Sequence, residues 1–254
     1  MINLINKKHT AEDIVQRRSD ISKRFIKASH NIQSGVITAI LSADLVLMFV
    51  LYDQLFFDNW FKDSYKGKMK FSLSRRMTKS AGSTICPKNI AELKPEKVVL
   101  EIRIGVDFFF QYGMVEGPKP VCGVNTNNSL EALQLVFEHE LCHIIEYICF
   151  GASNCRGGRF KTIANNLFAH TASHHNLPTY QQIANQKFAL NIGDTVLFTF
   201  KGKQLKGVIV NITKRATIMV KDKNGLFVDK QGIRYTKYYV PLNLLEPANH
   251  REGS

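Results

Sequence analysis

The 254-residue sequence lacks the features that mark several specialised classes of protein. Its five cysteines include no CxxC pair, and an odd number of cysteines spread over a chain of this length is not a disulfide framework. Hydrophobic residues make up 44% and charged residues 22%, which excludes wholesale disorder and fibrous repeats. No apolar core of a secretory signal follows the first ten residues. We therefore expect a globular protein of a reducing compartment, the cytoplasm.

Long apolar runs are also missing. The longest apolar stretch, residues 36–52, is interrupted by Ser42 and Asp44 and is shorter than the ~20 residues that span a bilayer. Apolar side chains recur at three- and four-residue steps over residues 37–61, which predicts a helix with a wide buried face. We expect no membrane partner. The alternative is a membrane-associated protein that uses residues 37–61 and needs detergent for solubility.

Acidic residues are few relative to basic ones. The chain has 21 Asp and Glu against 34 Lys and Arg, which gives a net charge of +13 and a pI near 9.5. Ten basic and four acidic side chains fall between residues 188 and 247. Such a surplus favours a polyanionic partner, most often nucleic acid, although a basic face can also serve solubility alone.

The pattern along the chain predicts a mixed α+β protein in four parts. Residues 1–36 are polar and basic and predict a solvated helix or an arm, and residues 37–187 combine helical periodicity with strand-like alternation. Residues 188–247 consist of short strands between turn signals, which predicts a small β-barrel, and residues 248–254 form a tail. Further predicted helices are 130–150, 159–168 and 180–186, and the predicted strands are 69–73, 98–104, 195–200, 207–212, 217–221 and 238–242.

Residues 138–143 read EHELCH and contain an HExxH motif inside the predicted helix 130–150. Four residues make about one helical turn, so His139 and His143 project from one face and can bind one metal ion, with Glu140 beside them. Neutral imidazole suits Zn²⁺, and a zinc ion with an open position lowers the pKa of its bound water towards 7. Glu140 would then act as general base in peptide-bond hydrolysis. Two core histidines satisfied by their neighbours are the alternative, but burying these three groups without a metal is costly.

Several blocks of the sequence, in the same order, resemble the SprT-like or Spartan metalloprotease family. The blocks are YDQLFF at 52–57, FSLSRRMTKSAG at 71–82, the HExxH segment at 138–143 and the segment 151–168. The resemblance covers residues 44–177 and implies a helical, zincin-like metalloprotease core with a small sheet, zinc as cofactor and a protein substrate. Spartan-like enzymes are associated with removing proteins crosslinked to DNA, so the resemblance also implies substrates associated with nucleic acid.

The third zinc ligand is where this sequence departs from the family. The family usually has a His in a His-Gly-x-x-Phe/Trp element, but the corresponding segment here, residues 156–160, begins with Arg156, which cannot ligate zinc. Cys155, one residue earlier, is a competent thiolate donor, and we expect it to be the third ligand. Glu146 suits a hydrogen bond to a ligand better than direct coordination. The remaining candidates, in order, are His170, then His174 or His175, and last Glu146.

The C-terminal part resembles an SH3-like or KOW-type small barrel in residues 193–218. Its basic turns and the aromatic residues Tyr235, Tyr238 and Tyr239 would contact phosphates and stack on bases without reading their sequence. The leading hypothesis is a zinc metalloendopeptidase, cytoplasmic or nucleoid-associated, that binds DNA and cuts proteins held there. The alternative is a nucleic-acid-binding adaptor whose metal site is structural or degenerate.

Overall fold

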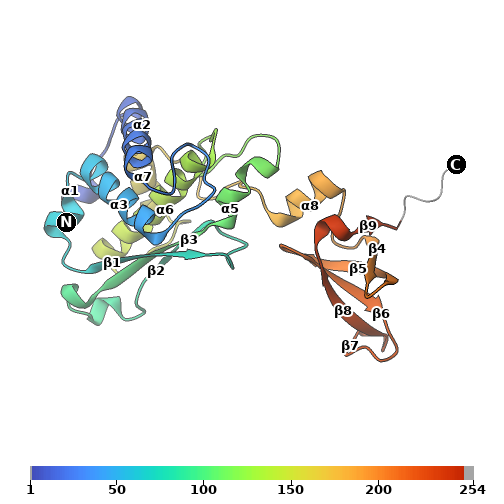
Figure 1. The fold of residues 1–254 in the computed structure, drawn as a ribbon. Coiled ribbons are helices and arrows are strands. Elements are labelled where there is room, and N and C mark those ends of the chain that lie inside the picture. Colours follow the sequence, from blue (N-terminus) through green and yellow to red (C-terminus); the bar gives the residue numbers. More distant parts are fainter. Residues whose placement is uncertain (1, 249–254) are drawn as a thin grey trace. The chain divides into compact units, whose positions relative to one another are not determined.

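The computed structural model describes residues 2–248, which form two compact units divided between Leu177 and Pro178 (Figure 1). Among these residues, no helix combines the length and the apolar character needed to cross a membrane. The helices and strands of the first unit are α1 (Ile2–Ile5), α2 (Ala11–Ala28), α3 (Ser42–Phe56), α4 (Trp60–Ser64), β1 (Lys68–Ser74), β2 (Gly82–Ile85), β3 (Val99–Gly105), α5 (Asp107–Phe110), α6 (Ser129–Phe150) and α7 (Gly158–Phe168).

A three-stranded mixed sheet forms one layer of the first unit. β3 lies in the centre, parallel to β1 and antiparallel to β2. Leu100, Ile102 and Ile104 of β3 are fully buried, whereas Glu101 and Arg103 between them are partly exposed, so alternation separates a core face from an outer face. Because β2 pairs with β3, the residues of β2 on the core face of the sheet also point towards the helices.

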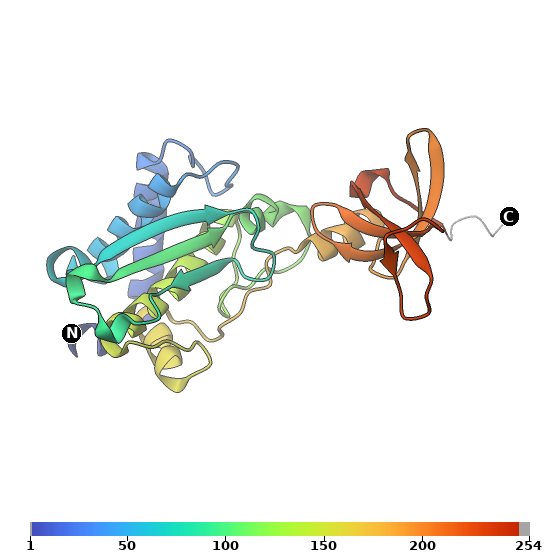
Figure 2. The ribbon, with the colours of Figure 1, turned by 90° about the horizontal axis from the view of Figure 1, so that it is seen from below.

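Helices cover the core face of this sheet (Figures 1 and 2). α3 packs against β1, α6 packs against β2 and β3, and α2 and α7 both pack against α6. Ile14, Ile21 and Phe25 of α2 are buried in the same core. Residues 11–28 therefore form a helix, one of the two alternatives expected from the sequence, and this helix joins the core of the first unit because its few apolar side chains fall on one face.

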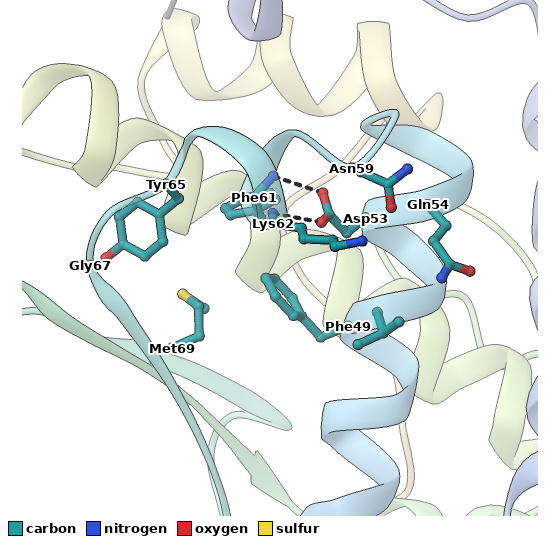
Figure 3. A pocket seen from close by; sticks show the side chains of 10 residues that line it. Phe49, Asp53, Gln54, Asn59, Phe61, Lys62, Tyr65, Gly67 and Met69 are labelled. Atoms are coloured by element: carbon teal, nitrogen blue, oxygen red, sulfur yellow. Dashed lines mark hydrogen bonds between the residues drawn. The ribbon is translucent and has the colours of Figure 1, made fainter.

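The helix expected over residues 37–61 is divided in two. α3 ends at Phe56, and α4 begins at the fourth residue after it. Asp53 fixes the turn between them, because its carboxylate accepts hydrogen bonds from the backbone N–H groups of Phe61 and Lys62, each at 2.9 Å (Figure 3). The Asp53 carboxylate, which lines the pocket shown in Figure 3, is thus already hydrogen-bonded to the start of α4.

The second unit is an antiparallel sheet with one helix against its core. The strand order is β7-β8-β6-β5-β4-β9, so β7 and β9 lie at its edges, and no pairing closes the sheet within residues 2–248. The described chain thus contains no closed barrel, and the strand pairing does not confirm the SH3-like small barrel predicted from the sequence. Its elements are α8 (Tyr180–Phe188), β4 (Thr195–Phe200), β5 (Lys203–Ile212), β6 (Ala216–Lys221), β7 (Phe227–Val228), β8 (Arg234–Val240) and β9 (Glu246–Pro247).

The division between the units falls ten residues before the predicted change at residue 188. α8 belongs to the second unit because Ala184 is buried in that unit's core together with Leu190. Pro178 and the N-cap residue Thr179 mark the start of α8, but the local sequence does not indicate which unit its buried residues Ile183 and Ala184 join. The mixed α+β class, the strands near 69–73 and 98–104 and the helix near 130–150 are confirmed.

The aromatic residues of β8 differ in exposure. Tyr239 is 63% exposed. Tyr238 instead packs against the rings of Phe198 and Phe200, with centroid distances of 5.4 and 5.1 Å. Tyr235 is partly buried and donates its hydroxyl hydrogen to an aspartate. Tyr238 is therefore packed within the unit while Tyr239 is exposed, because adjacent residues of a strand point to opposite faces.

Candidate metal centre

α6 carries the HExxH motif and has well-defined ends. Asn128 caps its N-terminus, because Oδ1 accepts the backbone N–H of Glu131 at 3.0 Å. Gly151 ends the helix with a φ of 69°, a left-handed conformation that glycine adopts without strain. Most of the helix between these residues is buried. The motif therefore lies on a rigid element of the core.

His139 and His143 lie one helical turn apart with their Nε2 atoms 3.2 Å from each other. The buried ring of Phe160, from α7, packs against both imidazoles at centroid distances of 4.9 and 4.6 Å. Burial, reinforced by the neighbouring His143, lowers the pKa of His139 to about 3, and burial lowers the pKa of His143 to about 4. Both imidazoles are therefore neutral near pH 7, which is the form that binds a metal ion.

Cys155 joins the two histidines from the loop between α6 and α7. Its Sγ and the ligating nitrogens of His139 and His143 all lie within 4.8 Å of one another. Within the part of the chain that the structure describes, no other three His, Cys, Asp or Glu side chains meet this condition. The structure thus brings together the three residues expected from the sequence to hold the ion.

The other candidate ligands are held elsewhere. The buried His170 has its Nε2 2.8 Å from Oε2 of Glu138. Nε2 of His175 accepts the backbone N–H of Ala81 at 3.0 Å. His174 is exposed and lines a small cleft next to the motif helix. Glu146 binds the side chain and backbone of the α6–α7 loop. These four residues were open alternatives in the sequence because they follow the motif at plausible distances along the chain.

The donor set fits zinc. A tetrahedral ion with Zn–N bonds of about 2.0–2.1 Å places two nitrogen ligands about 3.3 Å apart. The Nε2 atoms of His139 and His143 are 3.2 Å apart. Imidazole and thiolate donors suit Zn²⁺. Three protein donors leave a fourth position open, as in catalytic zinc sites.

The second ring nitrogen of each histidine also has a neighbour. Nδ1 of His143 lies 2.6 Å from Oγ of Ser153, and Nδ1 of His139 lies 3.7 Å from Sγ of Cys122. Burial raises the pKa of Cys122 to about 12, so this cysteine is a neutral thiol beside a ligand rather than a ligand itself. Contacts of this kind orient metal-bound imidazoles. Cys122 has no partner that the sequence alone reveals, because it precedes His139 by 17 residues and lies on a separate segment.

Glu140 lies next to the ligands on the side of β2. Its side chain is buried, and Oε2 accepts the hydroxyl hydrogen of Thr84 at 2.7 Å. Burial raises the pKa of Glu140 to about 7, and the hydrogen bond from Thr84 offsets only part of this effect. Such a carboxyl group can take up and release a proton near neutral pH. The adjoining cleft has a volume of about 80 Å³ and is lined by Gly82, His139 and His174 among others.

Glu138, immediately before the motif, forms a buried polar cluster that sequence reasoning missed. Its side chain is fully buried and accepts hydrogen bonds from Arg18 and from the Tyr52 hydroxyl, the latter at 2.8 Å, besides its contact with His170. Burial alone would raise the pKa of Glu138, but the charge of Arg18 and the hydrogen bonds lower it to about 2. The only signal in the sequence was a charged residue inside an apolar helical stripe.

The sequence matches the SprT-like family over residues 46–182, just over half of the chain. The matched segment includes the three-stranded sheet, the motif helix and the loop that holds Cys155. The protein therefore belongs to the SprT-like family, which is associated with metallopeptidase activity. No curated protein and no solved structure matches the chain. The strands of the second unit lie outside the family match.

Proposed function

We propose that this protein is a zinc-dependent metalloendopeptidase whose metal ligands are His139, His143 and Cys155. The observation that carries the proposal is the convergence of three ligating atoms within 4.8 Å, next to the buried carboxyl group of Glu140. Membership of the SprT-like family supports a metallopeptidase-like function. A bound zinc ion would polarise the scissile carbonyl and acidify a water molecule in its open coordination position.

The residues of the chain supply the remaining parts of the reaction. The ion would be held by Nε2 of His139, Nε2 of His143 and Sγ of Cys155. Glu140 accepts the proton of the attacking water and passes it to the leaving amine nitrogen. Thr84 holds Oε2 of Glu140, so we assign the proton transfer to Oε1. The ring of Phe160 shields the two imidazoles from solvent.

Metal analysis and cleavage assays on the full chain test this proposal. We expect one zinc ion per chain, lost in His139→Ala. Glu140→Gln should retain zinc but fail to cleave an unfolded protein such as casein, because the amide cannot accept the proton. Glu96→Gln, at an exposed carboxylate outside the site, is the matched control and should cleave normally. Zinc-loaded wild-type protein that cleaves nothing would contradict the proposal and favour an adaptor with a structural metal site.

We also propose nucleic acid, DNA in first place, as a partner of the second unit. Ten basic and four acidic residues between 188 and 247 support this partner, because lysine and arginine neutralise phosphates. Tyr239 and Phe200, 63% and 44% exposed, supply aromatic rings on which unpaired bases can stack. The proposed substrates are then proteins held on nucleic acid near the enzyme.

Binding of labelled single- and double-stranded DNA at several salt concentrations tests this partner. We expect the affinity of the wild type for DNA to fall steeply as salt rises. At a given salt concentration Tyr239→Ala should bind more weakly than the wild type, most clearly to single strands. Leu226→Ala, at an apolar side chain that is 89% exposed in the same unit, should leave binding unchanged. Affinity that does not depend on salt would contradict the partner.

A further inference from the structure

Glu146 is a buried carboxylate one helical turn beyond His143, and its contacts go to the loop between α6 and α7. It is 1% exposed. Its Oε2 accepts the Ser153 hydroxyl at 2.6 Å and the backbone N–H of Asn154 at 3.0 Å, while Oε1 accepts Nε–H of Arg159 at 2.7 Å. Hydrogen bonds to an ionised carboxylate are among the stronger ones in proteins. Glu146 therefore fixes the start of this loop against the motif helix.

Ser153 connects this carboxylate to a metal ligand. Its hydroxyl hydrogen points to Glu146, so its oxygen can only accept a hydrogen from Nδ1 of His143, 2.6 Å away. This arrangement places the proton of the neutral imidazole on Nδ1. The Nε2 atom of His143 then keeps its lone pair for a metal ion, on the side where Nε2 of His139 lies 3.2 Å away.

The same carboxylate also fixes the residues on both sides of Cys155. Asn154, whose N–H binds Glu146, accepts the backbone N–H of Arg156 through its Oδ1 at 3.1 Å and that of Gly157 through its carbonyl at 2.9 Å. These bonds form a tight turn around Cys155. The turn holds the thiol near the two histidines. The position of Cys155 therefore depends on Glu146 indirectly, through Asn154.

We infer that Glu146 is a positioning residue that sets the metal affinity of the site through two routes, the tautomer of His143 and the placement of Cys155. The inference rests on the proposed zinc site and adds a specific support for two of its three ligands. Outer contacts of this kind typically change metal affinity by about 10- to 100-fold when they are removed. A merely structural role for Glu146 would change the stability of the metal-free protein and leave zinc affinity unaltered.

Zinc affinity, measured by competition with a chromophoric chelator on the full chain, tests the inference. Ser153→Ala removes the link to His143 and should weaken zinc binding by about 10- to 100-fold, whereas Ser153→Thr keeps a hydroxyl and should restore most of the affinity. The matched control is Ser22→Ala in α2, which removes a serine hydroxyl that donates a hydrogen bond to Gln134 of α6 at 2.8 Å. This control should bind zinc like the wild type.

Cobalt substitution provides a second readout. Glu146→Gln should weaken the sulfur-to-cobalt charge-transfer band, because Cys155 is no longer held at the ion, while the melting temperature of the metal-free protein changes no more than in Ser22→Ala. Wild-type zinc affinity in Ser153→Ala together with an unchanged cobalt spectrum in Glu146→Gln would overturn the inference alone. Wild-type protein that binds no zinc would overturn both the inference and the proposed function, so the two failures are distinct. If Glu146→Gln does not fold, Ser153→Ala and Ser153→Thr decide.

Discussion

Arg18 of α2 and Glu138 of α6 form a buried, two-pronged ion pair. Nε of Arg18 lies 2.8 Å from Oε1 of Glu138, and Nη2 lies 2.6 Å from Oε2. Nη2 also donates to the carbonyl oxygen of Phe168 at the end of α7. One guanidinium group thus joins α2, the motif helix and α7. The family match begins at residue 46, so this support for the motif comes from outside the matched segment.

Replacing Arg18 by Met should destabilise the protein strongly, because it leaves a buried carboxylate without its main counter-charge. The expected loss is about 3–5 kcal/mol in the free energy of unfolding, measured by urea denaturation. Arg24→Met, at an exposed position of the same helix, should cost less than about 0.5 kcal/mol. The double variant Arg18→Met/Glu138→Gln should recover part of the loss. Equal losses of stability in Arg18→Met and Arg24→Met would show that the ion pair contributes little.

Replacing Gly82 by Ala should reduce cleavage without removing zinc. An added Cβ would lie 2.6 Å from Oε1 of Glu140 and 2.8 Å from Cγ1 of Val136, so the carboxyl group must shift. A displacement of about 1 Å at a reacting group can cost about 100-fold in rate. Zinc content and kcat/KM are measured together. The control is Gly113→Ala, where a Cβ meets nothing within 4 Å; normal cleavage by Gly82→Ala would exclude a catalytic role for this carboxyl position.

Replacing Thr84 by Val should lower kcat while leaving zinc content intact. The substitution keeps the shape of the side chain but removes the hydrogen bond to Oε2 of Glu140, which is 2.7 Å long. A hydrogen bond to a charged group contributes about 1.5–3 kcal/mol, so a decrease of at least about tenfold is expected. Thr84→Ser retains the hydroxyl and should retain most of the activity. An equal loss of activity in Thr84→Val and Thr84→Ser would instead indicate that the effect comes from lost packing.

Removing the metal should lower the melting temperature, because the ion binds the folded chain through residues of two separate segments. At a free zinc concentration about 100 times Kd, binding contributes about 2.7 kcal/mol. Chelation followed by re-addition of zinc, monitored by differential scanning calorimetry, should therefore produce a reversible shift. Cys155→Ala should show a much reduced shift, and His174→Ala, at an exposed residue, should behave like the wild type. A normal shift in Cys155→Ala would remove this residue from the ligand set.

Much of the fold could be predicted because it depends on local patterns. The alternation at 98–104 and the periodicity at 130–150 specify a strand and a helix within one segment, and both are present. Residues 11–28 were harder to interpret, since a helix with few apolar residues becomes part of a core only when a partner surface exists. The barrel was expected from strand spacing, but spacing along the chain says nothing about whether the first and last strands pair.

The sequence by itself determined the two histidines and the carboxyl group of the motif, because a four-residue step on a helix fixes their relation whatever surrounds them. Only the tertiary structure showed that Cys155, rather than His170, His174, His175 or Glu146, lies close to the two histidines, since distances from the motif depend on how loops fold back in space. It also decided that a charged residue such as Glu138 can be buried next to the site. The counter-charge for Glu138 comes from Arg18, 120 residues away in the chain.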